Sequence, residues 1–104
     1  GTFYAGPFAS TMLADQGATV VKLEQLEGDP IRFQMPVPEA SAVRVTQGKK
    51  SLAVNLFTPE GRRIAEELIR RADIVLHTYR GGVAARMGLD ADAALRINPN
   101  VIYH

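Results

Sequence analysis

The sequence contains no cysteine, carries almost no net charge and has no long hydrophobic run. The missing cysteines exclude disulfides, thiolate zinc sites and a cysteine nucleophile, and two histidines alone cannot build a His-rich metal site. Twelve Lys and Arg against eleven Asp and Glu give a net charge of +1, so the chain has no excess of basic residues that would favour nucleic-acid binding. No apolar run approaches the roughly 18 residues of a membrane span. We therefore expect a cytoplasmic chain that binds no metal, nucleic acid or membrane.

The length of 104 residues and the 46% hydrophobic content predict one domain spanning residues 1–104. Helical spacing of apolar residues predicts helices over 8–16, 59–72, 83–87 and 90–97. Alternating or continuous apolar runs predict strands over 18–24, 51–56, 74–76 and 101–103. Glycines and prolines interrupt the pattern over 25–50, where we expect a long loop. Strands that alternate with helices predict an α/β fold with a parallel sheet, and the run 74–76 predicts a strand covered on both faces.

Polar and aromatic residues gather where the predicted strands end, at 24–25, 55–57 and 78–80, and at 4–7 after a strand expected ahead of Gly6. Ligands of open α/β sheets bind outside the carboxyl ends of the strands. Nearby cations could bind an anion, as could the N-terminus of the helix at Pro7. These cations are Arg32, Lys49, Lys50 and Arg86. The pattern suits an adenine nucleotide with phosphates, and the alternative is a set of ordinary polar loops.

Other motifs give little support for chemistry. Gly6 and Glu24 have the coarse layout of a dinucleotide site, but the glycine fingerprint is missing, and the stretch 48–51 does not match a P-loop. His77 ends a predicted strand and His104 is the last residue, and we expect structural or surface roles for both.

Collinear segments along nearly the whole chain resemble the class III CoA-transferases, which include formyl-CoA and carnitine CoA-transferases and α-methylacyl-CoA racemase. The matching segments are Ala5-Gly6-Pro7, residues 13–18, Val20-Val21-Lys22-Leu23-Glu24, Gly28-Asp29-Pro30-Ile31-Arg32, residues 48–56, Pro59-Glu60-Gly61, Ala72-Asp73-Ile74-Val75, Arg86-Met87-Gly88-Leu89 and residues 98–103. The resemblance implies a Rossmann-like parallel sheet with helices on both faces, forming the N-terminal part of a larger domain truncated at both ends.

The resemblance also implies an activity. Coenzyme A would bind as the substrate thioester, with acyl-CoA and carboxylate substrates and no metal. The catalytic aspartate would lie beyond Tyr103, so we expect the chain alone to be inactive. In transferases that aspartate forms acyl-aspartyl and aspartyl-CoA intermediates, whereas in racemases acid and base residues exchange a proton. Family members form interlocked homodimers, so a partner chain is implied for the full-length protein.

Carried over by position, the family's CoA contacts fall on Tyr4, Ala5, Gln25, Val54, Asn55, Leu56, Phe57, Thr78, Tyr79, Arg80 and Arg86, and no catalytic residue falls within the chain. The chain departs from the family at three of these positions or beside them. His77 and Thr78 occupy positions where the family usually has an acidic residue and an asparagine, and Asn55 occupies a position where the family usually has an aspartate. Two alternatives are a non-catalytic homologue that binds a CoA ester and a structural fragment that completes a sheet or dimer.

Overall fold

The computed structural model describes residues 4–34, 36 and 38–104. The chain divides into two compact units, which we call the N-terminal unit (Gly1–Ala53) and the C-terminal unit (Val54–His104). The prediction of one domain over 1–104 stays a prediction. None of the helices in the described part of the chain is long and apolar enough to cross a membrane.

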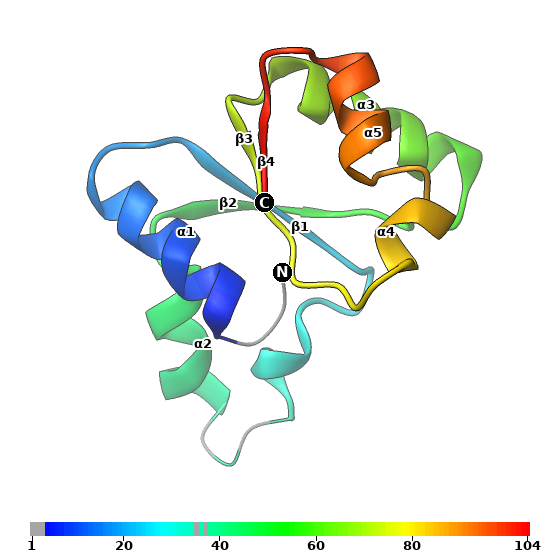
Figure 1. Cartoon of the computed structure of the whole chain (residues 1–104). Helices are drawn as coiled ribbons and strands as arrows, with labels where there is room; N and C mark the ends of the chain where they lie inside the picture. The colour runs from blue at the N-terminus through cyan, green and yellow to red at the C-terminus, as the bar shows by residue number, and fades with distance from the viewer. Residues whose placement is uncertain (1–3, 35, 37) are drawn as a thin grey trace. The chain divides into compact units, whose positions relative to one another are not determined.

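The N-terminal unit combines a parallel strand pair with two helices (Figure 1). Its elements in chain order are α1 (Ala5–Asp15), β1 (Val20–Glu24), the 3-10 helix η1 (Pro30–Arg32), α2 (Pro38–Thr46) and β2 (Lys49–Ala53). β1 and β2 run parallel, with Val20 opposite Lys49 and Glu24 opposite Ala53. Helix α1 packs against β1 and α2, and α2 packs against η1. The apolar centre is a cluster of Ile31, Ala42 and Val45.

Two predictions for this unit need correction. The segment 25–50 contains η1 and α2 and is not a loop throughout. Asp29 starts η1 by accepting a hydrogen bond from the Ile31 amide at 2.9 Å. Among the α2 side chains that the structure describes, Ala42 and Val45 are buried, and two buried residues are too few to show a helical period among the surrounding prolines. Met35 and Val37 lie outside the described residues.

Helix α1 begins at Ala5, three residues earlier than predicted. Pro7 lies in the first turn of the helix, where a missing backbone amide costs no hydrogen bond. The proline therefore does not prevent the helix from beginning before Phe8. Of the strand end expected ahead of Gly6, residues 1–3 lie outside the described residues and Ala5 belongs to α1. Gly17 ends the α1 turn with a φ of 99°, as its position after the helix predicts.

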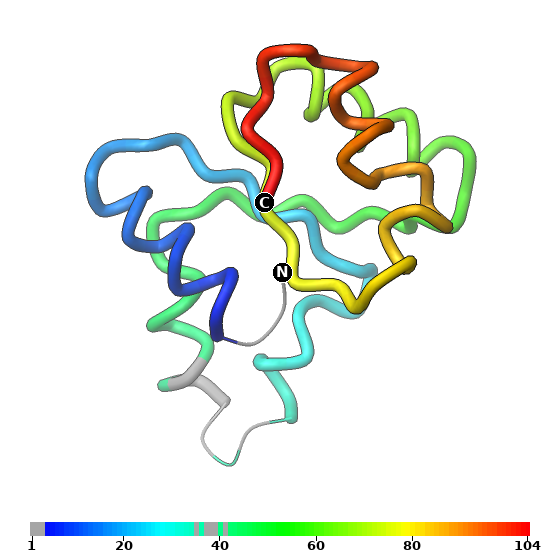
Figure 2. Tube along the Cα trace, in the orientation of Figure 1, coloured from blue at the N-terminus to red at the C-terminus, as the bar shows by residue number. Residues whose placement is uncertain are grey.

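The C-terminal unit contains a second parallel strand pair, whose two strands lie side by side in the trace of Figure 2. Its elements are α3 (Pro59–Arg71), β3 (Ile74–Val75), α4 (Val83–Arg86), α5 (Ala91–Ile97) and β4 (Ile102–Tyr103). Helix α3 packs against α5, and Ile69, Ala94 and Val101 form the buried core. The α/β class with parallel strands is confirmed, and the strands form two two-stranded sheets in the described residues.

The helix ends in this unit follow from local side-chain chemistry. The Thr58 hydroxyl accepts a hydrogen bond from the Gly61 amide at 3.1 Å, and Pro59 opens α3, as predicted. At the other end of α3, the Asn98 side-chain amide donates to the carbonyls of Ile69 at 3.0 Å and Ala72 at 2.8 Å. Carbonyls at a helix end lack partners within the helix, so Asn98 joins α3 to the segment after α5.

Strands of both units are shorter than predicted. β2 ends at Ala53, not at Leu56, because a turn begins at Asn55. The prediction that 74–76 is covered on both faces is wrong, since the Ile74 side chain is 43% exposed. β3 pairs with β4 alone in the described residues, so its apolar run is not that of a central strand.

Candidate functional site

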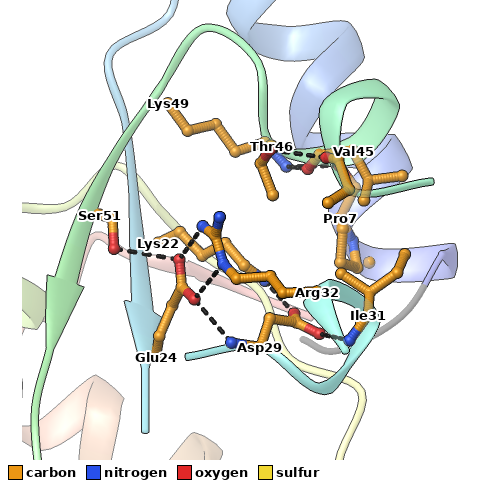
Figure 3. A network of polar contacts seen from close by, with 12 residues as sticks. Pro7, Lys22, Glu24, Asp29, Ile31, Arg32, Val45, Thr46, Lys49 and Ser51 are labelled. Carbon is orange, nitrogen blue, oxygen red and sulfur yellow. Dashed lines mark hydrogen bonds and ion pairs between the residues drawn. The ribbon is translucent and has the colours of Figure 1, made fainter. Parts of the chain in front are cut away.

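Ion pairs hold the chain at the end of β1, and Lys22, Glu24 and Asp29 are their buried members. Lys22 and Glu24 lie two residues apart on β1, so both side chains point to the same face of the strand. Lys22 forms a buried ion pair with Asp29. Arg32 donates from Nη2 to Glu24 Oε1 at 3.0 Å and from Nε to Oε2 at 3.2 Å, a two-pronged contact drawn in Figure 3. We call these four residues and Ser51 the β1 network.

Further hydrogen bonds complete the β1 network. Glu24 Oε2 accepts from the Asp29 amide at 2.7 Å, and Glu24 Oε1 accepts from the Ser51 hydroxyl of β2 at 3.0 Å. Burial disfavours ionisation of Glu24, but the hydrogen bonds from Arg32, the Asp29 amide and Ser51 outweigh it and hold the pKa of the carboxyl below its usual value. Glu24 therefore stays charged and fixes both ends of the 25–28 turn. Its oxygens serve this network, not a ribose.

Lys49 is the ammonium that joins α1, α2 and β2. Its Nζ donates to the carbonyls of Pro7 at 2.6 Å and Val45 at 2.8 Å, and to the Ser10 hydroxyl at 2.8 Å. Burial, with the nearby charge of Lys22, lowers the pKa of Lys49 to about 8, against the opposing charge of Asp29. An ammonium has three donors, and here all three bind protein atoms. The expectation that Lys49 would bind an anion is therefore wrong.

The predicted contacts of the N-terminal unit lie at two positions on its surface. Tyr4, 43% exposed, and exposed Ala5 begin α1, where the Tyr4 carbonyl accepts from the Phe8 amide at 2.6 Å. Gln25 is exposed directly after Glu24, and its carbonyl accepts from the Gly28 amide at 2.9 Å. The β1 network thus determines where the Gln25 backbone lies.

In the C-terminal unit, the predicted contacts 54–57 form a tight turn before α3. Asn55 Oδ1 accepts from the Phe57 amide at 3.0 Å, and the Asn55 carbonyl accepts from the Thr58 hydroxyl at 2.8 Å. A Cβ at Gly61 would lie 1.9 Å from the Asn55 carbonyl oxygen, so only glycine permits this approach. Val54 is buried, Leu56 is half-buried and Phe57 is 80% exposed. The turn therefore offers Asn55 and the Phe57 ring to a ligand, and not the Val54 side chain.

The remaining predicted contacts follow β3 and flank α4. Thr78, Arg80 and Arg86 are exposed and Tyr79 is 41% exposed. The Arg80 carbonyl accepts from the Val83 amide at 3.1 Å, and Arg86 is the last residue of α4. A short helical turn thus separates the two guanidinium groups in the chain.

His77 is half-buried between two tyrosine rings at the carboxyl ends of β3 and β4. The ring centroids of His77 and Tyr79 lie 5.4 Å apart at 30°, and those of His77 and Tyr103 lie 5.3 Å apart at 66°. We call these three side chains the ring cluster. Burial lowers the pKa of His77, which favours the neutral ring. The prediction of a structural or surface role agrees with this packing but missed the contact with Tyr79.

Sequence reasoning also missed Lys22 and Asp29 as partners. A lysine within the β-branched run 20–23 was the available signal, because a cation on a strand face that packs on a helix needs a counter-charge. In the described residues no three His, Cys, Asp or Glu side chains group together as metal ligands.

Parallel strands with cationic and aromatic side chains at their carboxyl ends define an α/β protein with a candidate nucleotide-type site. The model of CoA-transferase family III matches residues 1–104. The chain therefore belongs to CoA-transferase family III.

Individual relatives agree with this assignment. The chain is 37% identical over 110 residues to a succinate–glutarate CoA-transferase of Agrobacterium fabrum. The matched region covers 95% of the chain and 28% of the relative. It is 38% identical over 103 residues to a formyl-CoA:oxalate CoA-transferase of Streptomyces avermitilis, covering 95% of the chain and 25% of the relative. The chain thus spans about a quarter of the length of these curated relatives.

Solved structures resemble the fold closely. The crystal structure of Rv3272 from Mycobacterium tuberculosis matches with a TM-score of 0.93 at 35% identity, covering 99% of this chain and 29% of that one. A CAIB/BAIF family protein from Brucella suis matches with a TM-score of 0.92 at 34% identity, covering 98% of this chain and 29% of that one.

Proposed function

We propose that this chain is the CoA-ester-binding part of a class III CoA-transferase. The observation that carries the proposal is the family match over all 104 residues, together with relatives that are CoA-transferases acting on small dicarboxylic acids or their CoA esters. The exposed residues after β1, β2 and β3 supply the groups that CoA requires. These are Gln25, Asn55, Phe57, Thr78, Tyr79, Arg80 and Arg86.

Each group suits a different part of CoA. The guanidinium groups of Arg80 and Arg86 have planar donor sets that match phosphate oxygens. The exposed rings of Phe57 and Tyr79 suit the adenine base or the apolar parts of the pantetheine arm. Tyr4, Ala5, Gln25 and the 54–57 turn supply further contacts, with Val54 contributing backbone atoms because its side chain is buried.

The proposed reaction is covalent catalysis by an aspartate outside these 104 residues. Its carboxylate attacks the acyl-CoA carbonyl and the CoA thiolate leaves, which gives an acyl-aspartyl anhydride. Attack of the thiolate on the aspartyl carbonyl then forms aspartyl-CoA and releases the donor acid. The acceptor acid takes CoA by the reverse steps. This chain would keep CoA bound after its thiolate has left the acyl group, so that the thiolate attacks the aspartyl carbonyl before CoA diffuses away.

Transfer is favoured over racemisation because the relatives described above are CoA-transferases. Racemisation would need an acid and a base on opposite sides of the carbon next to the thioester. A binder without turnover is the second candidate, supported by the departures at Asn55, His77 and Thr78. An interlocked homodimer, which the resemblance supports, and a cytoplasmic location, which the composition predicts, are part of the proposal.

Substitution of the two arginines tests the binding part of the proposal. In the protein that carries this chain, Arg80→Ala and Arg86→Ala should weaken CoA binding by about 1.5 to 3 kcal/mol where a charged hydrogen bond is lost. The matched control is Arg96→Ala, an exposed arginine on α5, with an expected change within about 0.5 kcal/mol. Titration calorimetry at two salt concentrations gives the affinities. Unchanged CoA affinity in both variants at both salts would reject the site.

An activity assay tests the transfer part. The protein that carries this chain should move CoA from an acyl-CoA donor to a carboxylate acceptor, whereas the 104 residues alone should show no turnover above a blank. A protein that binds CoA but transfers it to none of several dicarboxylates, while racemising an α-methylacyl-CoA, would establish the racemase alternative. Binding with neither reaction would favour the non-catalytic binder.

A further inference from the structure

The backbone of His77 is held by β4. The His77 amide donates to the His104 carbonyl at 2.9 Å, and the His104 amide donates to the Val75 carbonyl at 2.9 Å. The parallel ladder between β3 and β4 thus continues for two residues beyond Val75. His77 is therefore the last residue of this segment with a strand-like position, and the exposed residues 78–80 begin directly after it.

The side chain of His77 is fixed from the β4 side. The Tyr103 ring meets the imidazole edge-on, with centroids 5.3 Å apart. Tyr103 is itself anchored, because its hydroxyl donates to the Leu89 carbonyl at 2.7 Å and its ring packs against the core of Ile69, Ala94 and Val101. An edge-to-face ring pair of this kind has a defined geometry. The imidazole is therefore held against a rigid part of the C-terminal unit.

The other side of His77 holds Tyr79. The two rings stack at 5.4 Å, and the Tyr79 amide donates to His77 Nδ1 at 3.1 Å. A nitrogen that accepts a hydrogen bond carries no proton, so the neutral ring has its proton on Nε2. The imidazolium form has donors at both nitrogens and cannot accept this bond. His77 thus contacts both the backbone and the ring of Tyr79, and the backbone hydrogen bond forms only with the neutral imidazole.

We propose that His77 is a positioning residue for Tyr79, holding its backbone and ring in the orientation that contacts CoA. This inference rests on the proposed function, in which Tyr79 touches CoA. His77 lies outside the buried core of Ile69, Ala94 and Val101, and Tyr79 is 41% exposed. Loss of the contact should therefore disorder Tyr79 more than it destabilises the unit, and CoA affinity should fall with little change in melting temperature.

Three substitutions separate the ring from the hydrogen bond. His77→Phe keeps an aromatic ring and removes the acceptor, His77→Asn keeps a short acceptor and removes the aromatic ring, and His77→Ala removes both. In the protein that carries this chain, calorimetry with CoA at pH 7.5 should show about tenfold weaker binding for His77→Ala, and a smaller loss for the other two. If His77→Ala does not fold, the same comparison is made with His77→Phe.

A pH series supplies a readout that packing alone would not change. As pH falls through the lowered pKa of His77, the imidazolium can no longer accept from the Tyr79 amide. Among the described residues, the titratable groups that face His77 are the phenols of Tyr79 and Tyr103, which stay neutral, and His104 on the β4 side. CoA affinity should therefore fall more steeply below pH 6.5 in the wild type and in a His104→Gln control than in His77→Asn.

A double-mutant cycle separates failure of this inference from failure of the proposed function. Tyr79→Ala should weaken CoA binding, and His77→Ala should add little further loss in that background. If Tyr79→Ala binds CoA like the wild type, the proposed contact at Tyr79 is wrong. If Tyr79→Ala binds weakly while His77 variants bind normally, or lose affinity only in proportion to lost melting temperature, the positioning role of His77 is wrong.

Discussion

The two units each carry predicted CoA contacts after parallel strands, but they hold those segments by different physical means. In the N-terminal unit, the turn after β1 is fixed by ion pairs, with buried Lys22 on buried Asp29 and exposed Arg32 on buried Glu24. In the C-terminal unit, the segments after β2 and β3 are fixed by a glycine contact, helix caps and stacked rings. Similar loops can therefore be held by charge or by shape.

This difference predicts different weaknesses. A buried charge that loses its partner keeps its desolvation cost, so the N-terminal unit should be sensitive to loss of a single carboxylate. A close backbone contact tolerates changes of charge but not of volume, so the C-terminal unit should be sensitive to an added methyl group. Substitutions with matched controls in each unit test the distinction.

The largest effect is expected from Asp29→Ala. This change removes the carboxylate that pairs with the buried Lys22 and the acceptor for the Ile31 amide, so the free energy of unfolding should fall by about 3 to 5 kcal/mol. Asp15→Ala, at an exposed carboxylate at the end of α1, should change it by less than about 0.5 kcal/mol. Urea unfolding measures both. Equal effects of the two variants would contradict a charge-held turn.

Gly61→Ala should give the next largest effect. Its methyl group would lie 1.9 Å from the Asn55 carbonyl oxygen and would push the 54–57 turn away from α3, which should cost about 2 to 3 kcal/mol. Gly81→Ala is the control, since a Cβ there meets nothing within 4 Å. A Gly61→Ala variant as stable as Gly81→Ala in urea would show that the turn is not held by this contact.

Asn98→Ala should have a smaller effect. It removes the donor to the carbonyls of Ile69 and Ala72 at the end of α3 and should cost about 1 to 2 kcal/mol. Asn100→Ala is the control, because this exposed residue lies two positions later and its loss leaves the Asn98 cap of α3 intact. The free energy of unfolding should change little in this variant. Hydrogen exchange of the last turn of α3 gives a local measurement. Unchanged exchange in Asn98→Ala would mean that the cap does not stabilise that turn.

The smallest effect concerns the titration of Lys49. Its pKa of about 8 in the folded chain lies below its ordinary value of 10.5, so the unfolded chain binds more protons between these values. The contribution of Lys49 to the free energy of unfolding should therefore rise with pH over that window. Urea unfolding at pH 8 and pH 10 should show a smaller rise in Lys49→Met than in the wild type. Identical rises would contradict the lowered pKa.

The parts of the fold that local chemistry determines could be predicted from the sequence. Thr58 and Pro59 mark the start of α3, and its apolar spacing continues to Ile69. α2 could not be predicted, because Ala42 and Val45, buried residues among its described side chains, cluster with Ile31 from another element. Tertiary contacts, not periodicity, make that segment helical.

The candidate site was predictable to a similar degree. The positions after strands, such as Gln25 and Tyr79, follow from the rule that ligands bind at the carboxyl ends of strands. The partners of Lys49 could not be predicted, because Pro7 and Ser10 lie some 40 residues away in the chain and only the packing of α1 brings them near. The same holds for Ser51, which reaches Glu24 only through the pairing of β1 with β2.

Hydrogen–deuterium exchange of the protein that carries this chain, with and without saturating CoA, tests the central claim most directly. The proposed site predicts slower exchange on CoA binding for amides at Gln25, 55–57 and 78–80, with little change at the centre of α3. Binding of CoA that slows exchange at none of these three segments would contradict the claim that this chain forms the CoA site.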